Sequence, residues 1–363
     1  MLQRYKTTCQ CGNAIEVSVK VGNNGLQIYC QCGKLLVEYL QDKAASVFDS
    51  LNDTFQAAEQ ESDQAAAKPG DKDVAEEMTG PPSKTGRQFG DYTIIKKLGE
   101  GGMGKVYLVH NNSNGEKQAL KVLQKIDNAD MIRYFIREAQ ILSELDHPNI
   151  VKIKGQGNHN RRPYIAMEYV IGKTLAELVA QSGPLRPVPV AQVIVYVLRA
   201  LEYAAQKKII HRDIKPHNIF LTDNGVVKLI DLGLSKAIDE SYQLSKTGKM
   251  AGTPFYMPLE QMDNAKCADY RSDIYAVGAT MFHLLCGQPP YLEYANDLYA
   301  TMLAKTANSY IRLTQRNSQL PAEIVKIVEK AMAHDPAERY ATACDMKLAI
   351  IAYYKTVNVK QAR

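Results

Sequence analysis

Residues 211–218, which read HRDIKPHN, and Asp231 constrain the fold of this chain more than any other stretch. The β-prone segments 219–221 and 226–230 follow the loop with the turn-forming sequence TDNG between them, and the second segment runs directly into Asp231. This pattern predicts a β-hairpin. Because the two strands of a hairpin lie side by side, we expect the polar residues of 211–218 to lie close to Asp231.

The loop supplies an aspartate, a lysine and an asparagine, which together with Asp231 are the groups that phosphoryl transfer needs. The reaction uses one carboxylate to accept the proton of the attacking hydroxyl, and a second carboxylate and an amide oxygen to hold Mg²⁺. Asp213 fits the first role, and Asn218 and Asp231 fit the second. The alternative is a buried, charged turn without chemistry, because an HRD triplet by itself is weak evidence.

The loop resembles the signature of the eukaryotic-type (Hanks-type) serine/threonine protein kinases in their bacterial form, in which HRD, an asparagine and DFG follow in order. Leu232 stands where most members have phenylalanine. The resemblance extends over residues 89–355 and implies an α+β, bilobal protein kinase fold with a β-rich N-lobe and a helical C-lobe. It also implies ATP with Mg²⁺ or Mn²⁺, and protein substrates phosphorylated on serine or threonine. Lys215 is the serine/threonine-type feature and would offset charge on the γ-phosphate.

A glycine-rich hairpin is expected to cover the nucleotide. Glycines in the segment LGEGGMGKVY, which starts at Leu98, leave the backbone free to approach phosphates. Dinucleotide-binding folds share this glycine spacing, but in them a helix follows, whereas here β-prone residues follow. By this reasoning and by resemblance, the candidate ATP-binding residues are Leu98, Gly99, Glu100, Gly101, Gly102, Met103, Gly104, Val106, Ala119, Lys121, Met167, Glu168 and Val170.

Lys121 and Glu138 are predicted to hold the nucleotide phosphates. The alternation of the strand around ALKV places Lys121 on the phosphate side. Residues 128–145 are predicted to form an amphipathic helix with Glu138 in its middle, where it can pair with Lys121. By resemblance, Met167 borders the rear of the nucleotide pocket, and the backbone of 168–170 binds adenine.

Residues 235–251 and the sequence GTPFYMPLE that follows resemble an activation segment, which docks the peptide substrate. The family ending Ala-Pro-Glu is Pro-Leu-Glu here. By resemblance, Glu260 is expected to form a buried ion pair with Arg339, and Asp273 is expected to brace the backbone of the catalytic loop. Thr253 agrees with serine or threonine substrates.

Arg212 beside the catalytic aspartate predicts regulation by phosphorylation. A phosphate on Ser245 or Thr247 would add a charge of roughly −2 near Arg212 and could order the segment through charge-assisted hydrogen bonds. We therefore expect autophosphorylation, in trans within a homodimer. The alternative is that both are ordinary loop hydroxyls.

The first forty residues are predicted to form a zinc-ribbon-like module with four cysteines (1–40). The sequence CQCG occurs twice, and a β-prone run follows each copy. Four thiolates brought together by a hairpin make a tetrahedral Zn²⁺ site, although zinc knuckles usually place two residues, rather than one, between their cysteines. Reduced cysteines in a small β-unit and an iron–sulfur cluster are the alternatives. The proposed zinc ligands are Cys9, Cys11, Cys30 and Cys32.

Composition limits the remaining possibilities. Residues 41–88 are rich in acidic residues and read as a partly disordered linker, and 356–363 as a C-terminal tail. The net charge of +5 is too small to indicate a nucleic-acid partner. No apolar run of roughly 18 residues and no apolar signal core occur, so we expect no membrane contact and a cytoplasmic location.

Two other function classes compete with a protein kinase. One is a pseudokinase or scaffold whose N-terminal ribbon recruits partners, and the other is a small-molecule kinase of similar fold. The catalytic residues are all present, which argues against the first. The peptide-docking segment argues against the second.

Overall fold

The structure is a computed structural model that describes residues 2–8, 14–22, 25–29, 35–38, 87–100, 104–124, 129–231, 254–264, 267–295 and 297–361. The chain divides into two compact units, Met1–Asp53 and Thr54–Arg363.

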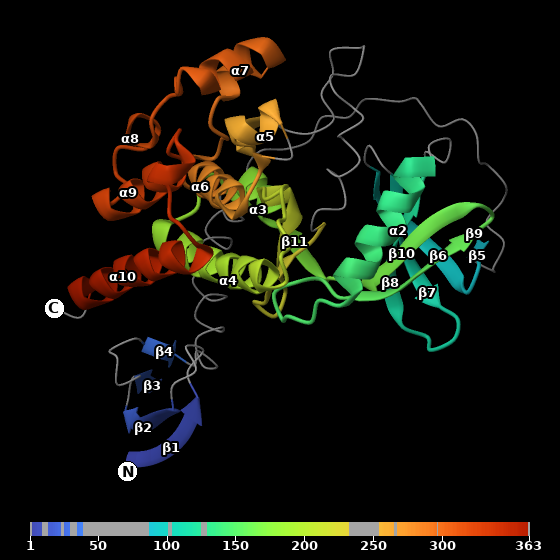
Figure 1. The fold of residues 1–363 in the computed structure, drawn as a ribbon, viewed down its shortest axis with the longest axis horizontal. Helices are drawn as coiled ribbons and strands as arrows, with labels where there is room; N and C mark the ends of the chain where they lie inside the picture. Colours follow the sequence, from blue (N-terminus) through green and yellow to red (C-terminus); the bar gives the residue numbers. More distant parts are fainter. Residues whose placement is uncertain are drawn as a thin grey trace, which may run out of the picture. The chain divides into compact units, whose positions relative to one another are not determined.

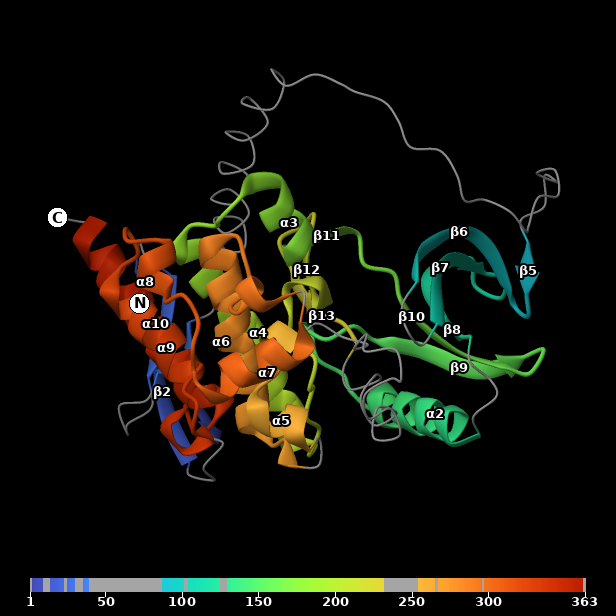
Figure 2. The same cartoon turned by 90° about the horizontal axis from the view of Figure 1, so that it is seen from above.

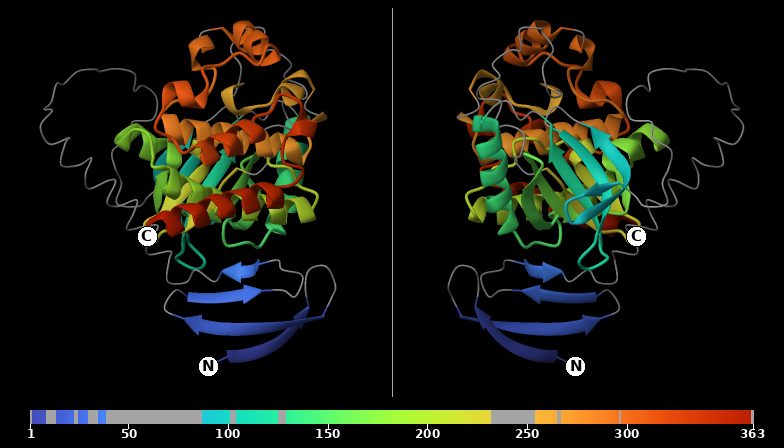
Figure 3. Two further views of the ribbon diagram at one scale, coloured as in Figure 1. Left: turned by 90° about the vertical axis from the view of Figure 1, so that its left-hand side faces the viewer. Right: turned by 90° about the vertical axis from the view of Figure 1, so that its right-hand side faces the viewer.

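The first unit is a four-stranded antiparallel sheet in which the strands follow one another in chain order (Figure 3). Its strands are β1 (Leu2–Thr8), β2 (Ala14–Gly22), β3 (Gly25–Tyr29) and β4 (Leu35–Glu38). Gly22 pairs with Gly25, so β2 and β3 form a hairpin. Cys9, Cys11, Cys30 and Cys32 lie outside the described residues.

The second unit begins with a six-stranded antiparallel sheet in the order β5-β6-β7-β8-β10-β9 (Figure 2). Its strands are β5 (Gln88–Phe89), β6 (Tyr92–Glu100), β7 (Gly104–Asn111), β8 (Lys117–Leu123), β9 (Ile153–His159) and β10 (Arg162–Glu168). Buried Val109, Leu120 and Val122 form part of its core. Helix α2 (Ala129–Ser143), the amphipathic helix predicted from sequence, packs against β9 and β10.

Helices make up most of the rest of the unit (Figure 1). They are α3 (Leu175–Ser182), α4 (Pro187–Gln206), α5 (Leu259–Asp263), α6 (Tyr270–Cys286), α7 (Leu298–Thr306), α8 (Leu313–Arg316), α9 (Ala322–Ala331) and α10 (Ala343–Gln361). Helix α6 is buried along nearly its whole length and packs against α4 and α9. A Cβ atom at Gly278 would lie 2.8 Å from the Cβ of Ala331, so this close packing requires glycine.

Helix α4 is, among the described residues, the one helix long and apolar enough to cross a membrane by length and composition. It packs against α6, α10 and β13 (Val227–Leu229), and ten of its residues are buried. Its apolar composition is therefore accounted for by its place in the core of the helical lobe.

A small three-stranded sheet carries the predicted catalytic hairpin. It consists of β11 (Gly172–Thr174), β12 (Ile219–Thr222) and β13, and Ile219 pairs with Leu229 as the hairpin requires. The short 3₁₀ turn η1 (Pro216–Asn218) leads into it. In the part of the chain that the structure describes, further such turns are η3 (Pro254–Tyr256), η5 (Leu292–Tyr294) and η6 (Pro336–Glu338).

The last helix continues further than the sequence prediction. Residues 356–363 were expected to form a tail, but α10 extends to Gln361. No proline or glycine interrupts 343–361, so nothing in the local chemistry ends the helix at 355. Buried Tyr353 also anchors the helix against the lobe.

Candidate active site

The catalytic loop brings three predicted residues into direct contact. The Nζ of Lys215 lies 2.9 Å from Oδ2 of Asp213, and the Nδ2 of Asn218 donates to the same oxygen at 2.9 Å. Asn218 also donates to the carbonyl oxygen of Asp213 at 2.8 Å. The carboxylate of Asp213 is therefore held in one orientation by two side chains that follow it within five residues.

Asp273, at the start of α6, holds the backbone of the loop. Its Oδ2 accepts from the backbone N–H of His211 at 2.8 Å, and its Oδ1 accepts from that of Arg212 at 2.7 Å. The predicted bracing role of Asp273 is present in these two contacts. They also satisfy two backbone donors in a part of the loop where water has little access.

His211 is fully buried and connects the two halves of the site. Its Nε2 donates to the carbonyl of Ile230, and its Nδ1 accepts from the backbone N–H of Asp213 at 3.2 Å. Burial lowers the pKa of His211, so the ring is neutral. A neutral ring with one donor and one acceptor fits both partners.

Two residues of the site have left-handed backbone conformations, which are uncommon outside glycine. Arg212 has φ of 64° and Asp231 has φ of 55°. Such strain persists where the surroundings over-determine the backbone, and it clusters at functional sites. Here the Asp273 and Ile230 contacts hold the chain on either side of these positions.

Lys121 reaches across from the N-lobe to the catalytic hairpin. It is nearly buried on β8, and its Nζ lies 2.7 Å from Oδ1 of Asp231. Its side chain therefore points to the site, as the strand alternation predicted. Glu138 lies in α2, but its side chain is outside the described part of the chain, so the Lys121–Glu138 pair stays a prediction.

The structure places several of the predicted nucleotide-binding residues on the N-lobe sheet or directly after it, and their contact with ATP stays a prediction. Met167 and Ala119 are buried and are partners in the β8–β10 register. A small cavity lies behind Met167, lined by Leu142, Ile150, Val151, Ile153, Met167, Leu229 and Asp231. Leu98, Glu100 and Val106 lie on β6 and β7, and Val170 follows β10. Gly101, Gly102 and Met103 lie outside the described residues.

Two glycines of the predicted glycine-rich hairpin, Gly99 and Gly104, differ in what a side chain at their position would contact. Among the described residues, a Cβ atom at Gly99 would meet nothing within 4 Å, so contact with those residues does not require a glycine there. At Gly104 a Cβ atom would lie 2.2 Å from the carbonyl oxygen of Val122. Close approach of β7 to β8 therefore explains Gly104 without any ligand.

The comparisons with known proteins agree with this geometry. The protein kinase domain matches residues 92–348. The chain belongs to the protein kinase family. It is 36% identical over 280 residues to serine/threonine-protein kinase PrkC of Bacillus subtilis, which is 76% of this chain and 42% of that protein. The chain thus spans less than half of the length of that relative.

Solved structures of kinases are similar to this fold. The kinase domain of Mycobacterium tuberculosis PknI matches with a TM-score of 0.58 and 26% identity, covering 75% of this chain and 99% of that one. The structure of Rad53 residues 1–466, solved in complex with AMP-PNP, matches with a TM-score of 0.58 and 25% identity, and the match covers 71% of this chain and 64% of that one. The bilobal protein kinase fold expected from sequence is confirmed.

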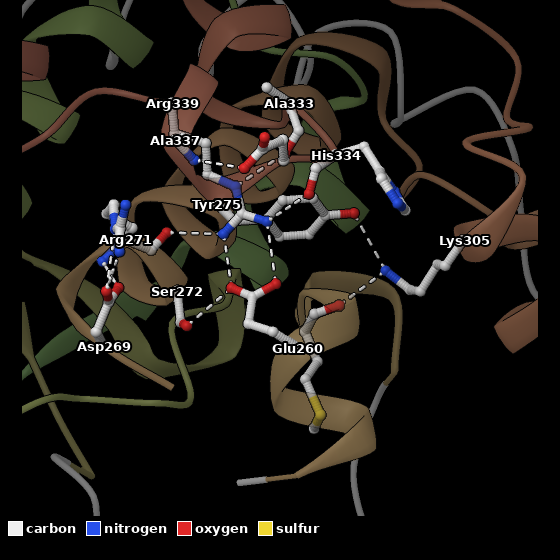
Figure 4. A network of polar contacts seen from close by, with 12 residues as sticks. Glu260, Asp269, Arg271, Ser272, Tyr275, Lys305, Ala333, His334, Ala337 and Arg339 are labelled. Atoms are coloured by element: carbon white, nitrogen blue, oxygen red, sulfur yellow. Dashed lines mark hydrogen bonds and ion pairs between the residues drawn. The ribbon is translucent and has the colours of Figure 1, made fainter. Parts of the chain in front are cut away.

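The expected ion pair at the end of the kinase activation segment is present (Figure 4). Arg339 donates to both carboxylate oxygens of Glu260, at 2.7 and 3.1 Å, and Ser272 donates to Oε1 at 3.0 Å. Burial by itself would raise the pKa of Glu260, but Arg339 outweighs this and leaves that pKa lowered. The change from Ala-Pro-Glu to Pro-Leu-Glu therefore leaves the pair intact. Ser245, Thr247 and Thr253 lie outside the described residues.

The sequence reasoning missed an ion pair that joins the kinase lobes. Glu168 ends β10, and its Oε1 lies 2.5 Å from Nζ of Lys228 on β13. The backbone of Glu168 is a predicted adenine contact, so this ion pair fixes the chain at a predicted nucleotide-binding residue. In the sequence, Lys228 lies between apolar residues, as a solvent-facing lysine on a strand does. Nothing in that pattern indicates that Glu168 is its partner.

Proposed function

We propose that this chain is a serine/threonine protein kinase that transfers the γ-phosphate of ATP to hydroxyl groups of proteins. One observation carries the proposal. The carboxylate of Asp213, with Lys215 and Asn218 bound to it, lies beside the same hairpin that presents Asp231 to Lys121 of the other lobe. A pseudokinase would have no need for this complete set.

Asp213, Lys215 and Lys121 have different roles in the proposed reaction. Asp213 orients the substrate hydroxyl and accepts its proton, because a carboxylate held in one orientation by Lys215 and Asn218 suits a general base. Lys215, 2.9 Å away, offsets the charge that builds up on the transferred phosphoryl group. Lys121 positions the nucleotide phosphates.

The donor set fits a divalent cation. Asn218 uses its Nδ2 for Asp213, which leaves its amide oxygen for another ligand, and Asp231 adds carboxylate oxygens. Hard oxygen donors of this kind suit Mg²⁺ or Mn²⁺. When bound, the ion would neutralise phosphate charge, and Asn218 and Asp231 are the residues that would hold it.

The test is phosphate transfer from ATP to a serine peptide by the full chain. We expect Asp213→Asn and Lys121→Met each to remove nearly all transfer. Lys326→Met is the matched control, because Lys326 is an exposed lysine on α9. Retention of the wild-type rate in either active-site variant would overturn the assignment of that residue.

Regulation by autophosphorylation in trans, within a homodimer, is part of the proposal. Arg212 supports it, since its backbone is fixed by Asp273 and by Gln261, whose Nε2 donates to its carbonyl at 3.0 Å. Incubation with ATP and Mg²⁺ should place phosphate on Ser245 or Thr247. Peptide mapping that finds none between residues 235 and 251 would refute this, and mixing wild type with Asp213→Asn separates transfer in trans from transfer in cis.

We further propose a structural Zn²⁺ in the N-terminal unit, held by Cys9, Cys11, Cys30 and Cys32. The strand topology supports it. Thr8 and Ala14 are partners at one end of β1 and β2, and the antiparallel order brings the end of β3 and the start of β4 to the same end of the sheet. Elemental analysis of the full chain should find about one zinc per chain. Zinc content that is unchanged when all four cysteines become serine would exclude the site.

A further inference from the structure

Lys305, near the end of α7, is a buried lysine outside the catalytic machinery. It is 2% exposed. Its Nζ donates to the carbonyl of Met257 at 2.8 Å, the hydroxyl of Tyr275 at 3.2 Å and the carbonyl of Phe255 at 3.3 Å. An ammonium has three N–H donors, so each one is used.

Two aromatic rings complete the surroundings of Lys305. The Nζ lies 4.3 Å from the ring centroid of Tyr291 and 5.1 Å from that of Tyr275. Tyr291 has φ of 63°, a conformation that is a genuine outlier for a bulky residue. The chain thus holds Tyr291 in a strained backbone at the position where its ring contacts the lysine, and such strain is typical of functional positions.

The charge balance at Lys305 is unfavourable. The carboxylate that attracts it, Glu260 on α5, is bound by Arg339, whose own charge repels the ammonium. Tyr275 on α6 and Tyr291 before η5 are the other titratable groups facing it, and burial holds the pKa of each above its usual value. Burial lowers the pKa of Lys305 to about 7. A methionine would fill this space without the free-energy cost of burying a charge, but it would leave the carbonyls of Phe255 and Met257 without the donor that Lys305 provides.

The two carbonyls belong to the end of the activation segment. Residue 256, between them, is also fixed, because the hydroxyl of Tyr256 donates to Nδ1 of His283 on α6 at 2.5 Å, while His283 also bonds the backbone of Gly287. A few residues on, Gln261 of α5 is bound to the carbonyl of Arg212 in the catalytic loop. Residues 255–257 are thereby fastened to α6 and α7 next to the catalytic loop.

We propose that Lys305 is a positioning residue for the protein substrate, which it serves by holding the backbone of residues 255–257 where the substrate peptide docks beside Asp213. The inference rests on the proposed kinase function. The contacts of Lys305 are with Phe255, Met257, Tyr275 and Tyr291, and none of these residues is assigned to ATP or to the transfer step. Loss of Lys305 should therefore weaken use of the peptide and leave nucleotide binding unchanged.

The experiment compares steady-state kinetics of wild type, Lys305→Met and the exposed control Lys326→Met. We expect Lys305→Met to raise the KM for a serine peptide by about tenfold or more, as for one lost hydrogen bond from a charged donor. The KM for ATP and the hydrolysis of ATP without peptide should stay at wild-type values, as should every constant of Lys326→Met. A peptide KM within about twofold of wild type, or an equal loss of ATP hydrolysis, would overturn the inference.

A second measurement uses the unaltered protein, so it does not depend on the folding of a variant. Above about pH 7 the neutral amine of Lys305 has only two donors and loses its attraction to both rings. The peptide KM of wild type should therefore rise between about pH 6 and 8.5 while the KM for ATP does not. A flat peptide profile would refute the positioning role. Absence of any transfer by wild type would instead refute the kinase function itself.

Discussion

Removal of one partner from the Glu260–Arg339 pair gives the sharpest test of how the helical lobe is held together. Arg339 is 4% exposed, and its other contacts among the described residues are with neutral groups, the carbonyls of Arg271, Ala333 and His334 and the ring of Tyr275. The substitution Glu260→Gln keeps the shape of the side chain but removes the negative charge. The guanidinium then stays buried without the carboxylate that is hydrogen-bonded to it, and the coulombic attraction of Asp269 is what remains.

The size of the effect follows from this burial. Loss of one member of a buried pair costs about 3–5 kcal/mol, because the remaining charge is left without its partner. The carboxylate side chain of Glu260 is 20% exposed, so solvent reduces the penalty, and we expect about 3 kcal/mol. That is a large share of the roughly 5–15 kcal/mol by which domains are stable.

Urea unfolding followed by circular dichroism in the far ultraviolet measures this loss. The chain has no tryptophan, so fluorescence offers little, whereas helices dominate the far-ultraviolet signal. Asp146→Asn is the matched control, because Asp146 forms an ion pair of 2.9 Å with Lys152 in which both side chains are at least half exposed. The control should leave the midpoint unchanged. A loss of less than about 1 kcal/mol in Glu260→Gln would contradict the argument that Arg339 depends on this carboxylate.

Three further predictions follow from other contacts. Burial lowers the pKa of His283 to about 4, so as the pH falls from 6.5 towards 4 the unfolded state takes up the proton of this histidine before the folded state does. The free energy of unfolding of wild type should therefore fall by about 2 kcal/mol between about pH 7 and 5, and His283→Gln should lack this loss. Urea unfolding at each pH measures the difference. Gly278→Ala should lower stability in urea by about 2 kcal/mol, because its Cβ would press against Ala331, and an unchanged midpoint would refute this. Asp273→Ala removes the carboxylate that accepts from His211 and Arg212, so kcat measured with a serine peptide should fall at least about tenfold with little change in the KM for ATP.

The catalytic hairpin was predictable because its determinants are local. A turn sequence between two β-prone runs specifies the hairpin, and Asp213, Lys215 and Asn218 lie so close in sequence that a tight loop brings them together. The fold followed from the motifs in the same way, since their order along the chain is that of the kinase family. The Glu260–Arg339 pair was expected only by resemblance, because 79 residues separate its members.

Contacts whose partners are backbone atoms or distant rings were not predictable. Lys305 binds the carbonyls of Phe255 and Met257, and every residue has a carbonyl, so no sequence pattern marks the two that are used. Glu168 and Lys228 look like ordinary surface charges on their strands. The direct contact between Lys121 and Asp231 depends on how the two lobes meet, which strand alternation does not describe.

The sequence by itself therefore determined the chemistry of the site and the order of its elements, since residue type, spacing and turn signals act over a few positions. The tertiary structure decided which charges are buried and which are paired. It also decided how residues 255–257 are bound to α6 and α7. Burial and pairing arise only when segments far apart in the chain come together and exclude water, and this exclusion turns an ordinary lysine such as Lys305 into a fixed donor.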